Sequence, residues 1–194
     1  MARRIFLHLT KEEKLYCQHE DKAKRRNCHI VVDYNLSLQA MIEAGNYDVA
    51  HEHLFNEKTF PVSGEGIQKI QLKLIKFQVG IFREYMIPIF KAAGLRPAFP
   101  AEILALGALQ PELQKTKIIV ALGQVGLGAA SQHVVGLCGN NQERRLGLDP
   151  IYHSWFPTSY FAAVADPEAN YKDRQDEAGN QDHQMFLGCS GWGW

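Results

Sequence analysis

The sequence predicts an α+β fold, in which helices pack on a small and mainly antiparallel sheet. Segments typical of helices dominate the first part of the 194-residue chain, and short apolar runs separated by Gly and Asn dominate the second. The two kinds of segment do not alternate, as they do in a parallel βαβ fold. The clearest strand is IQKIQLKLIKF, where Ile70, Leu72 and Leu74 alternate with polar residues. This period of two is typical of an antiparallel strand with one buried face.

Two helices are predicted before this strand. Thr10 followed by Glu13 forms a capping-box pattern at the start of a helix over residues 11–26. A short extended run, CHIVVDY, comes next. In the second helix, Ser37 is the expected N-cap and Gly45 the expected residue just beyond the last turn.

Two more helices are predicted after the strand. The first, in FREYMIPIFKAAG, ends at Gly94, and Pro88 must lie in its first turn or cause a kink. The second begins with Pro100 at the first helical position, and Gly107 is expected to end it.

From Lys117 onward the chain contains the short runs IIVALGQVG, HVVGLCG, RRLGLD and YFAAVA, each of the β type. The Gly-rich stretch GQVGLGAA between the first two runs does not match a nucleotide-binding pattern, and a hairpin turn or flexible loop is expected there. We therefore predict one α+β domain over residues 31–165, with a helical N-terminal extension over residues 1–30. Residues 166–194 are polar, net acidic up to residue 184, and expected to be a disordered tail.

The bulk composition limits the classes of partner. Lys plus Arg and Asp plus Glu both number 21, so the net charge is zero, which argues against general nucleic-acid binding. No apolar stretch approaches the roughly 18 residues of a membrane helix, and the N-terminal stretch MARRIFLHLTKEEK is not expected to act as an export signal. The four cysteines are then expected to be free thiols of a cytoplasmic protein.

The stretch YCQHEDKAKRRNCH contains clustered metal-ligand types, but these are weak candidates because their spacing is wrong for zinc. Residues two apart on a helix diverge by about 200°, and adjacent residues on a strand face opposite sides. We expect these residues to be structural, with no metal and no cofactor bound. The weak candidates are Cys17, His19, Cys28 and His29.

From residue 33 to residue 164 the chain resembles a family of short bacterial proteins of unknown function. The resemblance rests on YNLSLQAMIEAGNYD, on FPVSGEG with the strand after it, and on GLRPAFPAEILALGALQPELQ, IIVALG and RRLGLDPIYHSWFPTSYFAAVAD, in that order. It brings no known activity. The positions that match the family pattern G-L-R-P-A…E-x-L-A-L-G…I-V-A-L-G and its closing segment are Arg96, Pro97, Glu102, Gly107, Gly123, Arg144, Leu148 and Trp155.

The chain also departs from the family pattern. Phe99 stands where the pattern has a Ser/Thr-type helix cap, and Tyr160 replaces an arginine of the last strand. Ala165 and Asp166 replace its basic end, so the resemblance implies no anion contact there. The order of elements is similar to that of C-type-lectin-like domains, although the disulfides of that fold are missing.

The leading functional hypothesis is a non-enzymatic binding module that uses the turn-rich loops of its C-terminal half. Polar and aromatic side chains on loops suit recognition of a protein partner or self-association. The competing interpretation places Trp155 in the core and Arg144 in a surface ion pair. The proposed binding residues are Asn140, Asn141, Arg144, Tyr152, Trp155 and Tyr160.

Two alternatives stay open. The first is a small hydrolase or transferase in which Cys138 pairs with His133 or His153. The second is nucleic-acid binding through the basic residues 22–26, extended by Arg83, Arg96, Arg144 and Arg145.

Overall fold

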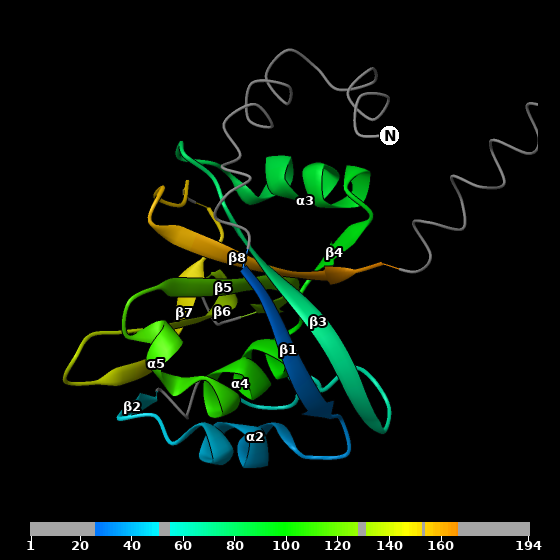
Figure 1. Ribbon diagram of the computed structural model, residues 1–194, viewed down its shortest axis with the longest axis vertical. Coiled ribbons are helices and arrows are strands. Elements are labelled where there is room, and N and C mark those ends of the chain that lie inside the picture. Colours follow the sequence, from blue (N-terminus) through cyan, green and yellow to red (C-terminus); the bar gives the residue numbers. More distant parts are fainter. Residues whose placement is uncertain (1–25, 51–54, 128–130, 153, 167–194) are drawn as a thin grey trace, which may run out of the picture.

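A mixed eight-stranded sheet forms the centre of the protein in the computed structural model, which describes residues 26–50, 55–127, 131–152 and 154–166 (Figure 1). Neighbouring strands are antiparallel except in the pairs β5–β8 and β2–β7, which are parallel. The predicted α+β class with a mainly antiparallel sheet is therefore confirmed. The strand order is β1 (Arg26–Asp33), β3 (Ile67–Lys76), β8 (Ser159–Ala165), β5 (Ile118–Leu127), β6 (Gln132–Gly139), β7 (Arg144–Pro150) and β2 (Val49–Ala50), and β4 (Leu95–Pro97) pairs with β8 off this path.

Helices cover both faces of the sheet. Helices α2 (Leu38–Gly45), α4 (Pro100–Leu109) and α5 (Pro111–Gln114) lie on one face, and α3 (Arg83–Ala92) lies on the other (Figure 1). Two hydrophobic cores result. Ala162 and Val164 of the central strand β8 point into the first core, and Phe161 and Ala163 point into the second. A strand buried on both faces has a nearly continuous apolar sequence, which explains the run YFAAVA.

Helix α2 begins as predicted but ends one residue later than predicted. Ser37 is the N-cap, and its Oγ accepts a hydrogen bond from the N–H of Ala40 at 3.2 Å, as expected. At the other end the prediction was wrong, because Gly45 is the last helical residue and Asn46 takes the left-handed conformation, with φ 46°. Asn is among the few non-glycine residues that tolerate this region. Gly45 serves packing instead, since a Cβ there would overlap the ring of Tyr47.

Pro88 lies in the second turn of α3, which excludes the first of the two predicted options, a first-turn position, and leaves the predicted kink as a prediction. Its ring nitrogen cannot donate to the carbonyl of Glu84, four residues earlier. Pro88 is on the exposed side of the helix, where water can satisfy that carbonyl, and Met86, Ile89 and Phe90 face the core.

Helix α4 lies between α2 and the sheet and is buried on nearly all sides (Figure 1). It begins at Pro100, as predicted. Gly107 does not end it, contrary to the prediction, because the helix continues to Leu109. The glycine allows close packing, since a Cβ there would overlap the hydroxyl of Tyr47.

A buried ion pair holds the start of α4. The N-cap residue Phe99 has no side-chain acceptor, but Oε2 of Glu102 accepts its backbone N–H at 2.7 Å. The Glu102 carboxylate is fully buried and binds the Arg96 guanidinium through two hydrogen bonds of 2.6 and 3.1 Å. Tyr34 donates to the same carboxylate at 3.0 Å, and burial, followed by the Glu102 charge, raises the pKa of Tyr34 above its ordinary value. This cluster joins β4, α4 and the end of β1.

Strands β5 and β6 form the hairpin expected around the Gly-rich stretch, although residues 128–130 themselves lie outside the described part. Their register shifts between Ala121 and Gly126, which indicates a β-bulge in β5. Within it, Gly123 donates its N–H to the carbonyl of Ala98 at 2.9 Å, and a Cβ on Gly123 would lie 2.7 Å from that oxygen. The glycine therefore lets β5 approach the start of α4.

The predicted domain boundary at residue 31 falls inside β1, which begins at Arg26. Residues 26–30 are thus part of the sheet and not of a helical extension. The rest of the predicted extension, residues 1–25, and the tail from residue 167 lie outside the described residues. Within the described ranges, no helix has the length and apolar character needed to cross a membrane.

Candidate protein-binding site

Two surface segments are joined by a short β-bridge beside the first turn of α3. Ile81 donates its N–H to the carbonyl of Trp155 at 3.3 Å, and Trp155 donates to the carbonyl of Ile81 at 3.0 Å. Both side chains are buried in the second core, at 1% and 3% exposure. The bridge therefore fixes the segment 79–85 against the segment 151–158.

The residues next to this bridge place aromatic rings in solvent. Side chains alternate along an extended backbone, so Phe82 and Phe156 point outward where Ile81 and Trp155 point inward. Phe82 is 41% exposed and Phe156 is 75% exposed. Tyr152 of the same loop is 66% exposed.

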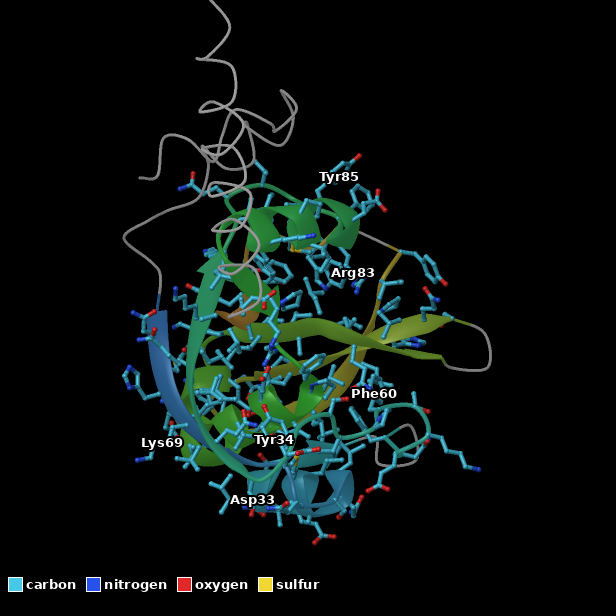
Figure 2. All side chains as sticks on the ribbon, turned by 90° about the vertical axis from the view of Figure 1, so that its right-hand side faces the viewer. Asp33, Tyr34, Phe60, Lys69, Arg83 and Tyr85 are labelled. Atoms are coloured by element: carbon cyan, nitrogen blue, oxygen red, sulfur yellow. The ribbon has the colours of Figure 1, made fainter. Side chains whose placement is uncertain are left out.

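Tyr85 completes this group, and its ring lies edge-on to that of Phe82 with centroids 6.5 Å apart. Figure 2 shows Tyr85 projecting from the outer side of α3. Tyr85 is partly buried against the second core, whereas the other three rings are exposed. We refer to Phe82, Tyr85, Tyr152 and Phe156 as the aromatic face. Exposed aromatic side chains on rigidly held segments are characteristic of protein-binding surfaces.

Trp155 belongs to the core, so its prediction as a binding residue was wrong. Its ring contacts Phe161 edge-on, with centroids 5.9 Å apart. The competing interpretation, which assigned Trp155 to the core, is confirmed. Trp155 instead anchors the loop that carries Tyr152 and Phe156.

Arg83 follows Phe82 of the aromatic face directly in the chain. It lies beneath α3, between the helix and the sheet (Figure 2), and its Nη2 donates to the carbonyl of Leu122 at 3.1 Å. Within the described ranges no carboxylate pairs with it, and its Nε has no hydrogen-bond partner. Burial lowers the pKa of Arg83, because the charge is removed from water without a counter-ion.

Arg144 is a buried structural residue and not a loop residue, which corrects both interpretations made for it. Its guanidinium donates to the carbonyl of Gly45 at 2.7 Å and to that of Gly107 at 2.7 Å. It also donates to the side-chain oxygen of Gln114 at 3.1 Å and lies 5.1 Å from the ring centre of Tyr47. One cation therefore binds the C-terminal parts of α2 and α4, where the helix dipoles favour positive charge.

The other predicted binding residues are dispersed. Asn140 is exposed, but its side-chain oxygen accepts the N–H groups of Gln142 and Glu143 and so shapes the β6–β7 turn. Asn141 is exposed in the same turn. Tyr160 lies within β8, partly buried. Of the six predicted residues, only Tyr152 belongs to the aromatic face.

The weak metal candidates do not form a cluster in the described part of the chain. The Cys28 side chain is buried while His29, on the opposite side of β1, is exposed, as the strand geometry predicts. Cys17 and His19 lie outside the described residues. Among the described residues, no three His, Cys, Asp or Glu side chains come together in a way that would hold a metal ion.

His133 and Cys138 do not converge. They lie five residues apart on β6, about 16 Å along the strand and on opposite faces of the sheet. Burial, and next the charge of Asp149, raises the pKa of the Cys138 thiol, which opposes thiolate formation. His153 lies outside the described residues.

The arginines proposed to extend a basic face are separated from one another. Arg96 binds Glu102, Arg144 is buried, and Arg145 pairs with Glu143. Residues 22–25 lie outside the described part.

Sequence reasoning missed Phe82, Tyr85 and Phe156, and it named Arg83 only as part of a basic face. The local signal was weak: FREYM was assigned to a helix, and WFP was read around its tryptophan. The bridge between residues 74 positions apart, which joins the two segments, has no sequence signature. Comparison of the chain with protein-family models, curated proteins and solved structures gives no match, so neither the family resemblance nor the lectin-like order of elements gains support.

Proposed function

We propose that the protein is a non-enzymatic interaction module that binds a protein segment carrying an apolar side chain next to a carboxylate. The observation that carries the proposal is the aromatic face, whose four rings are presented by two segments that the Ile81–Trp155 bridge holds together. Ordering costs are low when the binding residues are already fixed before the partner arrives.

The chemistry of the partner follows from Arg83. Its guanidinium is partly removed from water, and in the part of the chain that the structure describes it makes one backbone hydrogen bond and no ion pair. A carboxylate of the partner would supply the missing counter-ion, and the aromatic rings would cover an apolar neighbour of that carboxylate. Aromatic residues and arginine are the types most enriched at the centres of protein interfaces.

Selection of peptides from a random phage-displayed library against the intact protein tests this function. We expect enriched peptides to carry an aromatic or large aliphatic residue beside Asp or Glu. Binding should fall by at least about tenfold in Phe156→Ser, which removes the most exposed ring, and the preference for the acidic residue should be lost in Arg83→Met.

The matched control is Ile67→Ser, because Ile67 is 68% exposed but lies on β3, away from the aromatic face. This variant should bind as the unaltered protein does. Peptides that bind Phe82→Ser and Phe156→Ser variants as tightly as the unaltered protein would refute the proposal. Concentration-dependent dimerisation that Phe156→Ser abolishes would identify the partner segment as one of a second copy.

A cytoplasmic location and membership of the short bacterial family are part of this proposal. Cys138 has a free thiol, which fits a reducing compartment. The family resemblance rests on the ordered segments around GLRPA and IVALG.

A further inference from the structure

Strand β1 lies at one edge of the sheet. Among the residues that the structure describes, it pairs with β3 alone (Figure 1). Tyr34 donates its N–H to the carbonyl of Gly66 at 2.9 Å in the same register as the β1–β3 ladder. Because backbone groups alternate sides along a strand, the N–H and C=O groups of Asn27, His29 and Val31 point away from β3.

No described residue hydrogen-bonds to these edge groups. Edge strands are usually protected by a proline, an inward-pointing lysine or a bulge. Strand β1, with the sequence RNCHIVVD, contains no proline and no lysine, and its pairing with β3 shows no register shift. The edge is therefore competent to pair with a further strand.

An apolar groove of about 190 Å³ runs beside this edge, between β1, α2 and α4. Leu109 and Val31 at its rim are 55% and 48% exposed. The only charged side chain in its wall is Asp33, at the end of β1. The residues that line the floor are Val32, Met41, Leu104, Ala105 and Ala108. A strand added to β1 would place every second side chain over this groove.

We propose that residues 4–10, RIFLHLT, form this strand, antiparallel to β1. In the register that places Arg4 opposite Asp33, Ile5 lies opposite Val32, Leu7 opposite Ile30 and Leu9 opposite Cys28. The three apolar residues then face the same side as the buried face of β1, and Ile5 and Leu7 cover the groove.

Charge complementarity selects this orientation over a parallel one. The antiparallel strand brings the basic start of the segment, Arg3 and Arg4, to the carboxylate at the end of β1. The parallel strand would bring these arginines to Arg26 instead. Residues 11–25 are long enough to connect two neighbouring strands about 4.8 Å apart.

Disulfide trapping tests the register. The backbone N–H and C=O groups of Cys28 point toward β3, so Cys28 would form a non-hydrogen-bonded pair with a residue of the added strand. In such pairs the two Cβ atoms approach most closely. In a full-length chain with Cys17→Ser, Cys138→Ser and Cys189→Ser, Leu9→Cys should form an intramolecular disulfide with Cys28 after diamide oxidation. The matched control, His8→Cys, faces the other side of the strand and should remain reduced.

Hydrogen exchange gives an independent measure in variants that keep all four cysteines. The amides of His29 and Val31 should exchange slowly in the unaltered chain and roughly tenfold or more faster in Leu7→Asp, which puts a charge over the groove. His8→Asp carries the same charge on the outward side and should leave the exchange rates of both amides unchanged.

Several results would overturn the proposal. Fast exchange at both amides in the unaltered chain would show that the edge is open. A disulfide with Ile5→Cys and none with Leu9→Cys would show a parallel strand. Disulfide-linked dimers of Leu9→Cys would show that the segment comes from a second copy.

Discussion

In Gly107→Ala, packing against Tyr47 and helix propensity should change the free energy of unfolding in opposite directions. Gly107 lies inside α4, and replacing an interior helix glycine by alanine ordinarily stabilises a protein by about 1 kcal/mol. Here the added methyl group would overlap the Tyr47 hydroxyl. Tyr47 has little room to move, because its ring also packs against Gly45 and beneath Arg144.

The expected magnitude follows from these two terms. Overpacking in a closed site costs about 3 kcal/mol at the upper end of its usual range, so Gly107→Ala should lower the free energy of unfolding by about 2 kcal/mol net. For a domain of this size, the melting temperature should fall by about 4–8 °C. Urea unfolding followed by circular dichroism measures the free energy directly.

Tyr47→Phe is the matched partner in a double-mutant cycle. The Tyr47 hydroxyl is buried without a hydrogen-bond partner among the described residues, so its removal alone should stabilise the protein by about 1 kcal/mol. Without the hydroxyl, the nearest atoms to the new methyl group are Cδ1 of Leu137 at 3.1 Å and Cζ of residue 47 at 3.3 Å. Such contacts are tight but tolerable, and the coupling energy should be about 2–3 kcal/mol. Stabilisation by Gly107→Ala alone, or strictly additive effects of the two changes, would refute the packing argument.

Two further predictions concern other buried polar groups. Arg144→Met should lower the free energy of unfolding by about 3 kcal/mol, because it leaves the acceptors of Gly45, Gly107 and Gln114 unpaired. The control Arg145→Met removes only an exposed ion pair and should lower it by less than about 1 kcal/mol. Equal effects of the two changes in thermal unfolding would contradict the role assigned to Arg144. Stability should also fall as the pH rises above about 10, because burial raises the pKa of Tyr34 and of Tyr47 in the folded protein while the unfolded chain releases both protons near pH 10. Above pH 10, each tyrosine should lower the free energy of unfolding by up to about 1.4 kcal/mol per pH unit. Phenolate absorbance at 295 nm should show these two groups titrating only as the protein unfolds. Their titration in the folded state near pH 10 would contradict the burial argument.

The two proposed surfaces lie on opposite faces of the sheet. The aromatic face adjoins α3, and the groove beside β1 is lined by residues of α2 and α4. Figure 1 shows α3 on one face of the sheet and α2 and α4 on the other. The variants that test one surface should therefore leave the other intact. Phe156→Ser should not alter the β1 edge, and Leu7→Asp should not alter the Ile81–Trp155 bridge.

Local patterns predicted the elements of the fold well where a single short-range interaction decides them. The alternation of Ile70, Leu72 and Leu74 indicated β3, Ser37 indicated the start of α2, and Pro100 indicated the start of α4. Of the three predicted glycine terminators, Gly94 is confirmed, because it follows the C-cap Ala93 of α3 with φ 65°. Gly45 and Gly107 were wrong as terminators for one shared reason. A glycine is as useful for a close approach between helices as for a left-handed turn, and only the position of Tyr47 distinguishes the two uses at Gly45 and Gly107.

The candidate site was far less predictable than the fold. Arginine and tryptophan in a turn-rich segment are expected on a binding surface, but Arg144 binds the ends of two helices and Trp155 fills the second core. The partners of Arg144 lie 30 to 99 positions away along the chain, so no local pattern reports them.

The amino-acid sequence by itself determined which segments become helices and strands and that one sheet with helices against it forms, because hydrophobic periodicity and helix caps act over a few residues. The tertiary structure alone decided the strand order, the burial of Arg144 and Trp155, and the Ile81–Trp155 bridge that joins the segments carrying Phe82 and Phe156. These features depend on contacts between distant segments, whose free energy is set by packing in three dimensions and leaves no periodic trace in the chain.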